Sequence, residues 1–271
     1  MKDQRLAFLG GAGKIGSAII DGLLVSKTVT ASQIAVTARH DASLAAWQAR
    51  KVRGSTDNRA AVRGADLIVL CVHPDEVAAL LKEIAPRLTP RQLVISVVSG
   101  CSTQQIEKFC KHPLRVVRAM PNTPVMVRAS MTCLAAGRHA KPDDLATAQR
   151  IFATVGEVEV LDERHMNVAT GLGGCGPAFA FKIIEALSAG GVKMGLPRET
   201  ALKLAAQVLK GAAELVLTTK QHPAALKDAV TTPGGCTIDG LTKLEERGLA
   251  IALIDAVETA TRKAGRLLGG D

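Results

Sequence analysis

Aromatic residues are scarce in this sequence: it has no tyrosine and one tryptophan, and aromatics make up 2% of its 271 residues. Proteins that bind nucleic acid usually offer aromatic surfaces for stacking or a concentrated basic patch. The 34 lysines and arginines give a net charge of +9, but they are scattered along the chain and form no basic run. A nucleic-acid partner is therefore not expected. The charge instead fits the attraction of small anionic molecules into a positive cleft.

Paired cysteines and long hydrophobic runs are also missing. The six cysteines contain no CxxC pair, and their spacing fits neither a zinc site nor a disulfide framework. This predicts no metal centre, and reduced thiols in a cytoplasmic protein. Apolar runs such as Leu67–Val72 fall far short of the ~18 residues that span a bilayer. Met1–Arg5 lead directly into a predicted strand, so we expect neither a signal peptide nor a membrane association.

The first 162 residues alternate short β-rich runs with helical patterns. Strands are expected at Leu6–Leu9, Ile34–Thr37, Leu67–Val72, Leu93–Val98, Val116–Met120, Met131–Ala135 and Val158–Leu161. Helices are expected between them at Ile15–Leu24, Ala42–Arg50, Glu76–Ala85, Thr103–Phe109 and Pro142–Thr154. Unbroken runs of Val, Ile and Leu are typical of strands covered on both faces. The pattern predicts an α/β fold whose N-terminal domain, residues 1–162, is a Rossmann-type, doubly wound sheet.

Helical periodicity takes over after Asp162, and we place a second, all-helical domain at residues 163–271. Its expected helices are Ala178–Val192, Arg198–Leu217, Ala224–Ala229, Ile238–Glu246 and Leu249–Leu268. The last helix carries a narrow stripe of leucines and alanines at spacings of three and four, from Leu249 to Leu267. We interpret the stripe as part of a homodimer interface. Packing within one subunit is the alternative.

A glycine loop follows the first predicted strand. Gly11, Gly13 and Gly16 fit G-x-G-x-x-G between a strand and a helix, the context in which this motif binds a dinucleotide. The first glycine makes the turn, the second lets the pyrophosphate approach the backbone, and the third lets helix pack on strand. Gly10 adds another glycine, so the register is open by one residue, and an ordinary glycine-rich turn is the alternative.

The end of the second predicted strand bears on the choice of cofactor. An acid there would hold the ribose 2′-hydroxyl of NAD, but Thr37-Ala38-Arg39-His40 contains none before Asp41. Thr37 and Arg39 can bind a 2′-phosphate instead. We therefore expect NADPH to be preferred, with NADH possible. The alternative for Arg39 is a solvated surface arginine.

A second anion-binding loop is predicted near the other end of the chain. Thr232-Pro233-Gly234-Gly235-Cys236-Thr237 runs into a helical pattern that starts at Thr237. Two glycines let successive N–H groups point into one concavity, and the helix adds its positive N-terminal end. Such a loop suits a carboxylate or a phosphate. No acid–base pair stands out elsewhere, which is acceptable for hydride transfer because the cofactor carries that chemistry.

Several motifs together resemble one family. Arg118–Pro124 (RAMPNTP), Gly190–Pro197 (GGVKMGLP) and His222–Ile238 (HPAALKDAVTTPGGCTI) are similar to segments of Δ1-pyrroline-5-carboxylate reductases, and the similarity runs over nearly the whole chain. The resemblance implies NAD(P)H-dependent reduction of Δ1-pyrroline-5-carboxylate to L-proline. It also implies a Rossmann domain followed by a helical dimerisation domain, with dimers that can assemble into rings and a substrate site completed across the dimer.

The resemblance also implies site residues. The substrate carboxylate would lie on the Pro-Gly-Gly loop, with the Thr237 hydroxyl near the ring nitrogen as the catalytic contact. The substrate-binding residues are then Thr232, Gly234, Gly235, Cys236 and Thr237. The cofactor-binding residues, with Arg39 added from the strand-end argument, are Gly11, Ala12, Gly13, Lys14, Ile15, Thr37, Arg39, Asn58, Cys71, Val72, His73, Pro74, Val97, Val98 and Ser99.

The chain departs from the family pattern at four places. His73 stands where the family usually has lysine, Val98-Ser99 where it has Ala-Ala, and Cys175 and Phe179 replace a serine and a tyrosine. The glycine loop is also one residue longer than usual. Two other interpretations are open. One is a different reductase on the same two-domain plan, acting on another cyclic imine or on a β-hydroxyacid. A β-hydroxyacid dehydrogenase would need a catalytic lysine after the domain break, where the first lysine is Lys182, deep in a predicted helix. A redox-sensing NADP-binding module would need the Pro-Gly-Gly loop to be empty or blocked.

Overall fold

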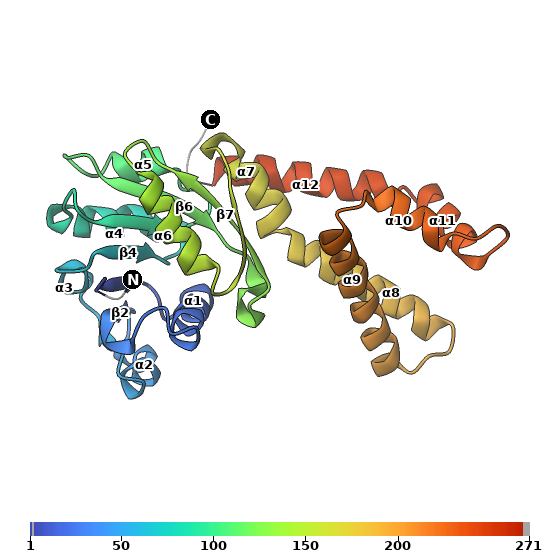
Figure 1. Ribbon diagram of the computed structural model, residues 1–271, viewed down its shortest axis with the longest axis horizontal. Coiled ribbons are helices and arrows are strands. Elements are labelled where there is room, and N and C mark those ends of the chain that lie inside the picture. Colours follow the sequence, from blue (N-terminus) through green and yellow to red (C-terminus); the bar gives the residue numbers. More distant parts are fainter. Residues whose placement is uncertain (2, 268–271) are drawn as a thin grey trace. The chain divides into compact units, whose positions relative to one another are not determined.

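A twisted sheet forms the centre of the N-terminal part of the protein (Figure 1). In the computed structural model, which describes residue 1 and residues 3–267, the sheet has eight strands in the order β3-β2-β1-β4-β5-β6-β7-β8. Neighbours from β3 to β6 are parallel, β7 is antiparallel to β6, and β8 is parallel to β7. The strands are β1 Leu6–Leu9, β2 Ile34–Thr37, β3 Arg53–Ser55, β4 Leu67–Leu70, β5 Leu93–Ser96, β6 Arg115–Met120, β7 Ser130–Ala136 and β8 Gly156–Val160.

Helices cover both faces of this sheet (Figure 1). One face packs against α1 (Lys14–Val25), α2 (Ala45–Ala49) and α6 (Pro142–Phe152). The other packs against α3 (Asn58–Val62), α4 (Val77–Ile84) and α5 (Thr103–Glu107). The arrangement confirms the predicted doubly wound, Rossmann-type sheet, and it explains why β1, β2, β4 and β5 are buried at every position.

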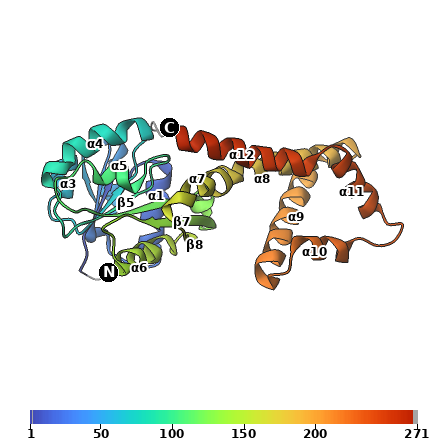
Figure 2. The same ribbon diagram turned by 90° about the horizontal axis from the view of Figure 1, so that it is seen from above.

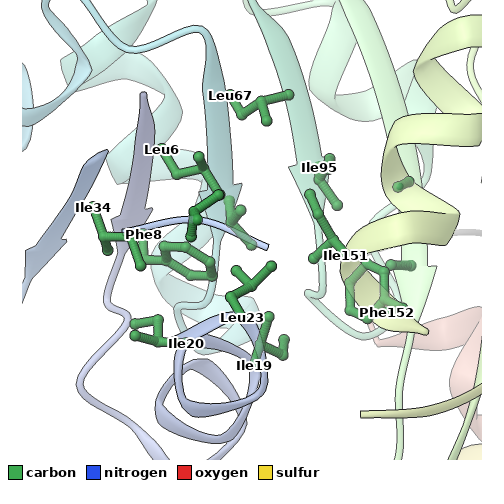
Figure 3. Close-up of a cluster of buried hydrophobic side chains, with 14 of the residues drawn as sticks. Leu6, Phe8, Ile19, Ile20, Leu23, Ile34, Leu67, Ile95, Ile151 and Phe152 are labelled. Carbon is green, nitrogen blue, oxygen red and sulfur yellow. The ribbon is translucent and has the colours of Figure 1, made fainter. Parts of the chain in front are cut away.

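The core on the α1 side is built from interlocked aliphatic and phenyl side chains (Figure 3). Phe8 of β1 and Phe152 of α6 are both fully buried within it. Each such side chain contributes about 1.5–3 kcal/mol of hydrophobic stabilisation. The sheet and its two helical layers therefore form a rigid platform on which loops at the strand ends can hold a ligand.

The chain divides into two compact units. The first comprises Met1–Cys175 together with the end of the last helix from Glu258 onward, and the second comprises Gly176–Val257. A short helix α7 (Met166–Ala169) and a π-helical segment (Thr170–Gly174) close the first unit before the chain enters α8. The remaining helices are α8 Gly176–Lys193, α9 Arg198–Thr219, α10 Pro223–Val230, α11 Cys236–Glu246 and α12 Leu249–Arg266. The predicted domain boundary after Asp162 stays a prediction.

The helical unit has almost no core of its own. Between Gly176 and Val257, a range described in full, only Ser188, Ala201 and Ala205 are buried. Helices α8 and α9 form a hairpin (Figure 2) in which a Cβ added at Gly191 would lie 3.1 Å from the Ala201 Cβ. No helix in the described part of the chain has the length and apolar character needed to cross a membrane.

The sequence predicts most of these elements within two residues, with instructive exceptions. Strands β4 and β5 end two residues earlier than expected, because Val72 and Val98 continue the apolar run but lie beyond the last ladder hydrogen bonds. The helix expected at Ala42–Arg50 is instead a 3-10 turn, Asp41–Ser43, followed by the short helix α2, which has only five residues. Strand β3, helix α3 and helix α7 were not predicted. Leu268, the expected last residue of the final helix, lies outside the described residues.

Candidate cofactor and substrate sites

A cavity of about 560 Å³ opens at the carboxyl ends of β1, β2 and β4. The strand order reverses between β1 and β4, and open α/β sheets bind ligands at such a switch point. The volume lies within the range of about 300–1,000 Å³ typical of small-molecule sites. The lining residues are Gly10, Ala12, Gly13, Thr37, Ala38, Arg39, Ser43, Thr56, Asn58, Cys71, Val72, His73, Glu76, Ala79, Leu80 and Glu83.

The glycine loop forms one wall of this cavity. Gly10 has a φ of 70°, so the left-handed turn falls one residue before Gly11, to which the motif assigned it. A Cβ at Gly16 would lie 2.5 Å from the Gly11 carbonyl oxygen, so helix α1 approaches the loop as closely as only glycine allows. At Gly13 a Cβ would meet nothing nearer than the Gly10 oxygen at 3.7 Å. The exposed Gly13 backbone thus leaves room for a pyrophosphate, and the loop fits a dinucleotide.

A chain of hydrogen bonds ties the glycine loop to the opposite wall. The Gly10 N–H donates to Thr37 Oγ1 at 3.1 Å, and the Thr37 hydroxyl donates to Asn58 Oδ1 at 2.7 Å. Asn58 Nδ2 in turn donates to Glu83 Oε2 at 3.1 Å. Because Thr37 is buried and its only hydroxyl proton goes to Asn58, it fixes the loop and has no proton left for a phosphate oxygen.

Arg39 is the cation that faces the cavity from the end of β2. Its guanidinium forms an ion pair with Glu76, which follows β4 and lines the same cavity. The Arg39 side chain is 75% exposed, so the pair can open without disturbing the core. An arginine in this position suits a 2′-phosphate, and its present partner is a carboxylate.

Two titratable groups follow β4 at the edge of the cavity. Burial raises the pKa of the Cys71 thiol to about 12, so it stays neutral at physiological pH and contributes shape rather than reactivity. His73, which stands where the family usually has lysine, is exposed, and its Nδ1 lies 2.6 Å from Asp75 Oδ1. The His73 ring is thus held by the carboxylate of Asp75, and Asp75 itself does not line the cavity.

The structure brings together only part of the predicted cofactor set. Ala12, Gly13, Thr37, Arg39, Asn58, Cys71, Val72 and His73 line the cavity. Gly11, Lys14, Ile15, Pro74, Val97, Val98 and Ser99 are described but do not line it. Val98 is buried in the core on the α4 side, and the Ser99 hydroxyl points at Met120 Sδ, 3.6 Å away. These assignments stay predictions.

Two carboxylates in the cavity were missed. Glu76 and Glu83 are seven residues apart, with Ala79 and Leu80 between them, so all four project from one face of the turn and helix that follow β4. That helical spacing directly after a buried strand is the signal that could have found them. Gly10, the first of the four glycines of the loop, makes the left-handed turn, a role that the sequence leaves open.

The Pro-Gly-Gly loop precedes α11 in the helical unit. Gly234 has a φ of 66°, and the Gly235 N–H donates to the Thr232 carbonyl at 3.0 Å, which closes a tight turn. A Cβ at Gly235 would lie 2.4 Å from Thr232 Oγ1, so any larger residue there would force the Thr232 side chain to turn away. Helix α11 begins at Cys236, two residues before the expected helix start at Ile238, and Thr237 is in its first turn. The helix-end amides from Cys236 onward are the donors that a carboxylate would meet, whereas the Gly235 amide is used within the turn.

The RAMPNTP segment braces the end of the first unit. Arg118 in β6 is buried, and its Nη1 lies 3.1 Å from Glu163 Oε1. Asn122 donates from Nδ2 to the Gly173 carbonyl at 3.0 Å, while its Oδ1 accepts the Met131 N–H. The segment Glu163–Gly174 is therefore fixed to the sheet at two points, and RAMPNTP has a structural role within this unit.

A Rossmann-type sheet with a glycine-loop cavity at its switch point is typical of dinucleotide-dependent oxidoreductases. In agreement, residues 5–100 match the family model described as NADP oxidoreductase, coenzyme F420-dependent, and residues 163–267 match the model described as pyrroline-5-carboxylate reductase dimerisation. Relatives named pyrroline-5-carboxylate reductase are 39–42% identical over almost the whole chain. The chain belongs to the pyrroline-5-carboxylate reductase family.

Relatives named pyrroline-5-carboxylate reductase match over almost their full length. The chain is 39% identical to the one from Methanosarcina acetivorans over 98% of this chain and 99% of the relative, and 42% identical to the one from Synechocystis sp. over 97% and 98%. Among solved structures, the Coxiella burnetii enzyme has a TM-score of 0.90 at 35% identity, covering 97% of this chain and 98% of that one. The Plasmodium falciparum enzyme with NADP bound has a TM-score of 0.88 at 29% identity, covering 99% of both chains.

Proposed function

We propose that this protein reduces Δ1-pyrroline-5-carboxylate to L-proline with NAD(P)H, the last step of proline biosynthesis, in the cytoplasm. The full-length similarity to reductases of that name carries the proposal. The cavity supports it, because a glycine loop with an open backbone and a facing arginine suits a phosphorylated dinucleotide. The six cysteines, all within the described residues, are free thiols, which suits a reducing compartment.

The reaction itself is the test. Protein, NADPH and the imine are mixed, absorbance of the reduced cofactor is followed, and proline is quantified. We expect one proline for each NADPH consumed. Cofactor oxidation without proline, or no oxidation at all, would contradict the proposal, and mixtures without imine or without protein give the background rate.

The site residues indicate which part of the reaction the cofactor would supply and which part the protein supplies. A dinucleotide bound in the cavity would supply the hydride for C5 of the imine ring. The ring nitrogen enters protonated, with a proton taken from water, and keeps the electron pair released from the C=N bond as it becomes an amine. The glycine loop and Arg39 hold the phosphates, and the amides at the start of α11 hold the substrate carboxylate. The chain thus contributes mainly orientation, which can supply effective molarities of order 10⁵ M.

The Thr237 hydroxyl is proposed to hydrogen-bond the ring nitrogen. Thr237 lies half-buried in the first turn of α11, next to the helix-end amides that would hold the carboxylate. We expect Thr237→Ala to lower kcat about tenfold, the worth of one hydrogen bond made at the reacting centre. Steady-state kinetics measure the effect, and thermal unfolding should be nearly unchanged.

Thr242→Ala is the matched control for this variant. It removes the same kind of hydroxyl five residues further along α11, where the hydroxyl only bonds the Ile238 carbonyl at 2.9 Å. We expect Thr242→Ala to keep kcat within about twofold of the starting protein. Equal rates for the two variants would remove Thr237 from the mechanism.

The helical unit is proposed to form a homodimer, and rings of dimers are part of the same proposal. Leu204, Val208 and Leu215 lie on one face of α9 and are each about half exposed or more in the single chain. A unit with so little core needs a partner to cover such a face. The family model for dimerisation spans this region.

Charges placed on that face test the dimer. We expect the double variant Leu204→Glu/Val208→Glu to lower the mass in solution to that of a single chain, because two carboxylates would have to be buried in the interface. Light scattering after size-exclusion chromatography gives the mass. Lys210→Glu, on the polar side of the same helix, should leave the mass unchanged. An intact dimer in the double variant would place the interface elsewhere.

A further inference from the structure

Glu76 brings a carboxylate into the same cavity as Arg39. The two side chains line the cavity together and form an ion pair. The other carboxylate of the lining, Glu83, accepts a hydrogen bond from Asn58 at 3.1 Å. Glu76 is therefore the acidic group that shares Arg39 with any ligand bound there.

The carboxylate is held more firmly than the guanidinium. Glu76 ends the one-turn helix Pro74–Glu76, and its Oε2 accepts the His73 N–H at 3.3 Å. Its side chain is 31% exposed, whereas that of Arg39 is 75% exposed. When the pair opens, we expect Arg39 to move and Glu76 to stay in the cavity.

The two nicotinamide cofactors differ only at the 2′ position of the adenosine ribose. A 2′-phosphate accepts hydrogen bonds from a guanidinium and is repelled by a carboxylate. A 2′-hydroxyl donates to a carboxylate, and in Rossmann domains an acid beside the glycine loop commonly fills that role. An arginine and a glutamate side by side therefore offer one favourable partner to each cofactor.

We propose that Glu76 sets the selectivity of this cavity between the two cofactors. It competes with the 2′-phosphate for Arg39, which weakens NADPH binding, and it accepts a hydrogen bond from the 2′-hydroxyl, which strengthens NADH binding. Glu76 thus takes over, from the loop after β4, the role of the acid that is missing at the end of β2. The inference rests on the cofactor site proposed above.

Two ribose fragments read this selectivity without any reaction. 2′,5′-ADP carries the 2′-phosphate, AMP carries the free 2′-hydroxyl and is otherwise identical, and isothermal titration calorimetry gives both dissociation constants. For Glu76→Gln we expect the ratio Kd(AMP)/Kd(2′,5′-ADP) to rise about fivefold, the size expected for an exposed charge pair together with one weakened hydrogen bond. The ratio of kcat/KM for NADPH to that for NADH should rise in parallel.

Asp41→Asn is the matched control. It removes one negative charge two residues from Arg39, at an exposed side chain that does not line the cavity. The ratio of the two dissociation constants in this variant should stay within about twofold of that in the starting protein, since exposed charges at a distance are screened. An equal rise in both variants would mean a general charge effect and would overturn the inference.

The remaining outcomes separate this inference from the proposed function. If both fragments bind but Glu76→Gln leaves the ratio unchanged, the inference is wrong and the cofactor site stands. If neither fragment binds the unmodified protein, the cofactor site is wrong and the inference falls with it.

A double-mutant cycle tests the competition directly. Arg39→Ala should lower the ratio of the two dissociation constants. In the Arg39→Ala background, Glu76→Gln should then change this ratio less than it does when Arg39 is present. Strictly additive changes in the two free energies would show that Glu76 does not act through Arg39, and would overturn the competition.

Discussion

Gly16→Ala is expected to abolish measurable NADPH binding and to lower the free energy of unfolding by about 1–3 kcal/mol, the usual cost of forcing extra volume into a packed site. The new Cβ would lie 2.5 Å from the carbonyl oxygen, 2.7 Å from the Cα and 2.9 Å from the carbonyl carbon of Gly11. All three atoms are backbone, so no side chain can rotate away. The loop itself would have to move, and with it the hydrogen bond from Gly10 to Thr37 that sets the cavity wall.

Fluorescence titration with NADPH and urea unfolding measure these two effects. Gly190→Ala is the control, because a Cβ at this position in α8 would meet nothing within 4 Å. It should leave NADPH binding unchanged. Affinity in Gly16→Ala within about twofold of the starting protein would show that the loop does not contact the cofactor.

Glu163→Ala is expected to lower the free energy of unfolding by about 3–5 kcal/mol, the usual cost of stranding a buried charge. Arg118 is only 3% exposed, and Glu163 is its carboxylate partner at 3.1 Å. The same Glu163 oxygen accepts the Thr103 N–H at 3.2 Å. Within the described residues, Nε and Nη2 of Arg118 already lack hydrogen-bond partners. No other group there would compensate the guanidinium charge once Glu163 is removed.

Urea denaturation gives the free energy, and two further variants interpret it. Asp21→Ala breaks the exposed pair with Arg50 and should cost no more than about 1 kcal/mol. Arg118→Met/Glu163→Met removes both buried charges and should recover much of the loss, since apolar side chains of similar size often replace a buried pair without penalty. A loss below about 1 kcal/mol in Glu163→Ala would mean that water reaches Arg118.

The elements that the sequence predicted well are those whose pattern is set locally. Strands β1 and β2 agree with prediction at both ends, because each is a short apolar run bounded by turn residues. Strand β3 was missed because its three residues are only partly buried at the edge of the sheet and include Gly54. A strand of that kind exists only through its partner β2, which no local pattern reveals.

The candidate site shows the same limit. The glycine loop could be found because its spacing follows from backbone requirements within seven residues. Glu76 could not be assigned to Arg39 in advance, since the two are far apart in sequence and meet only because β2 and β4 flank β1. The hydroxyl of Thr37 was expected to face a phosphate, and only the position of Asn58 shows where its proton goes.

The path of the backbone through the two units has a consequence for the integrity of the protein. Residues 176–257 leave the sheet-containing unit after Cys175 and rejoin it at Glu258 within α12. The helical unit is therefore connected to the first unit twice along the chain. A protease that cuts after Cys175 separates residues 1–175 from the rest covalently, but the end of α12 packs within the first unit, where Leu267 lies beside Gly100. A nicked molecule can keep its assembly through this non-covalent packing alone.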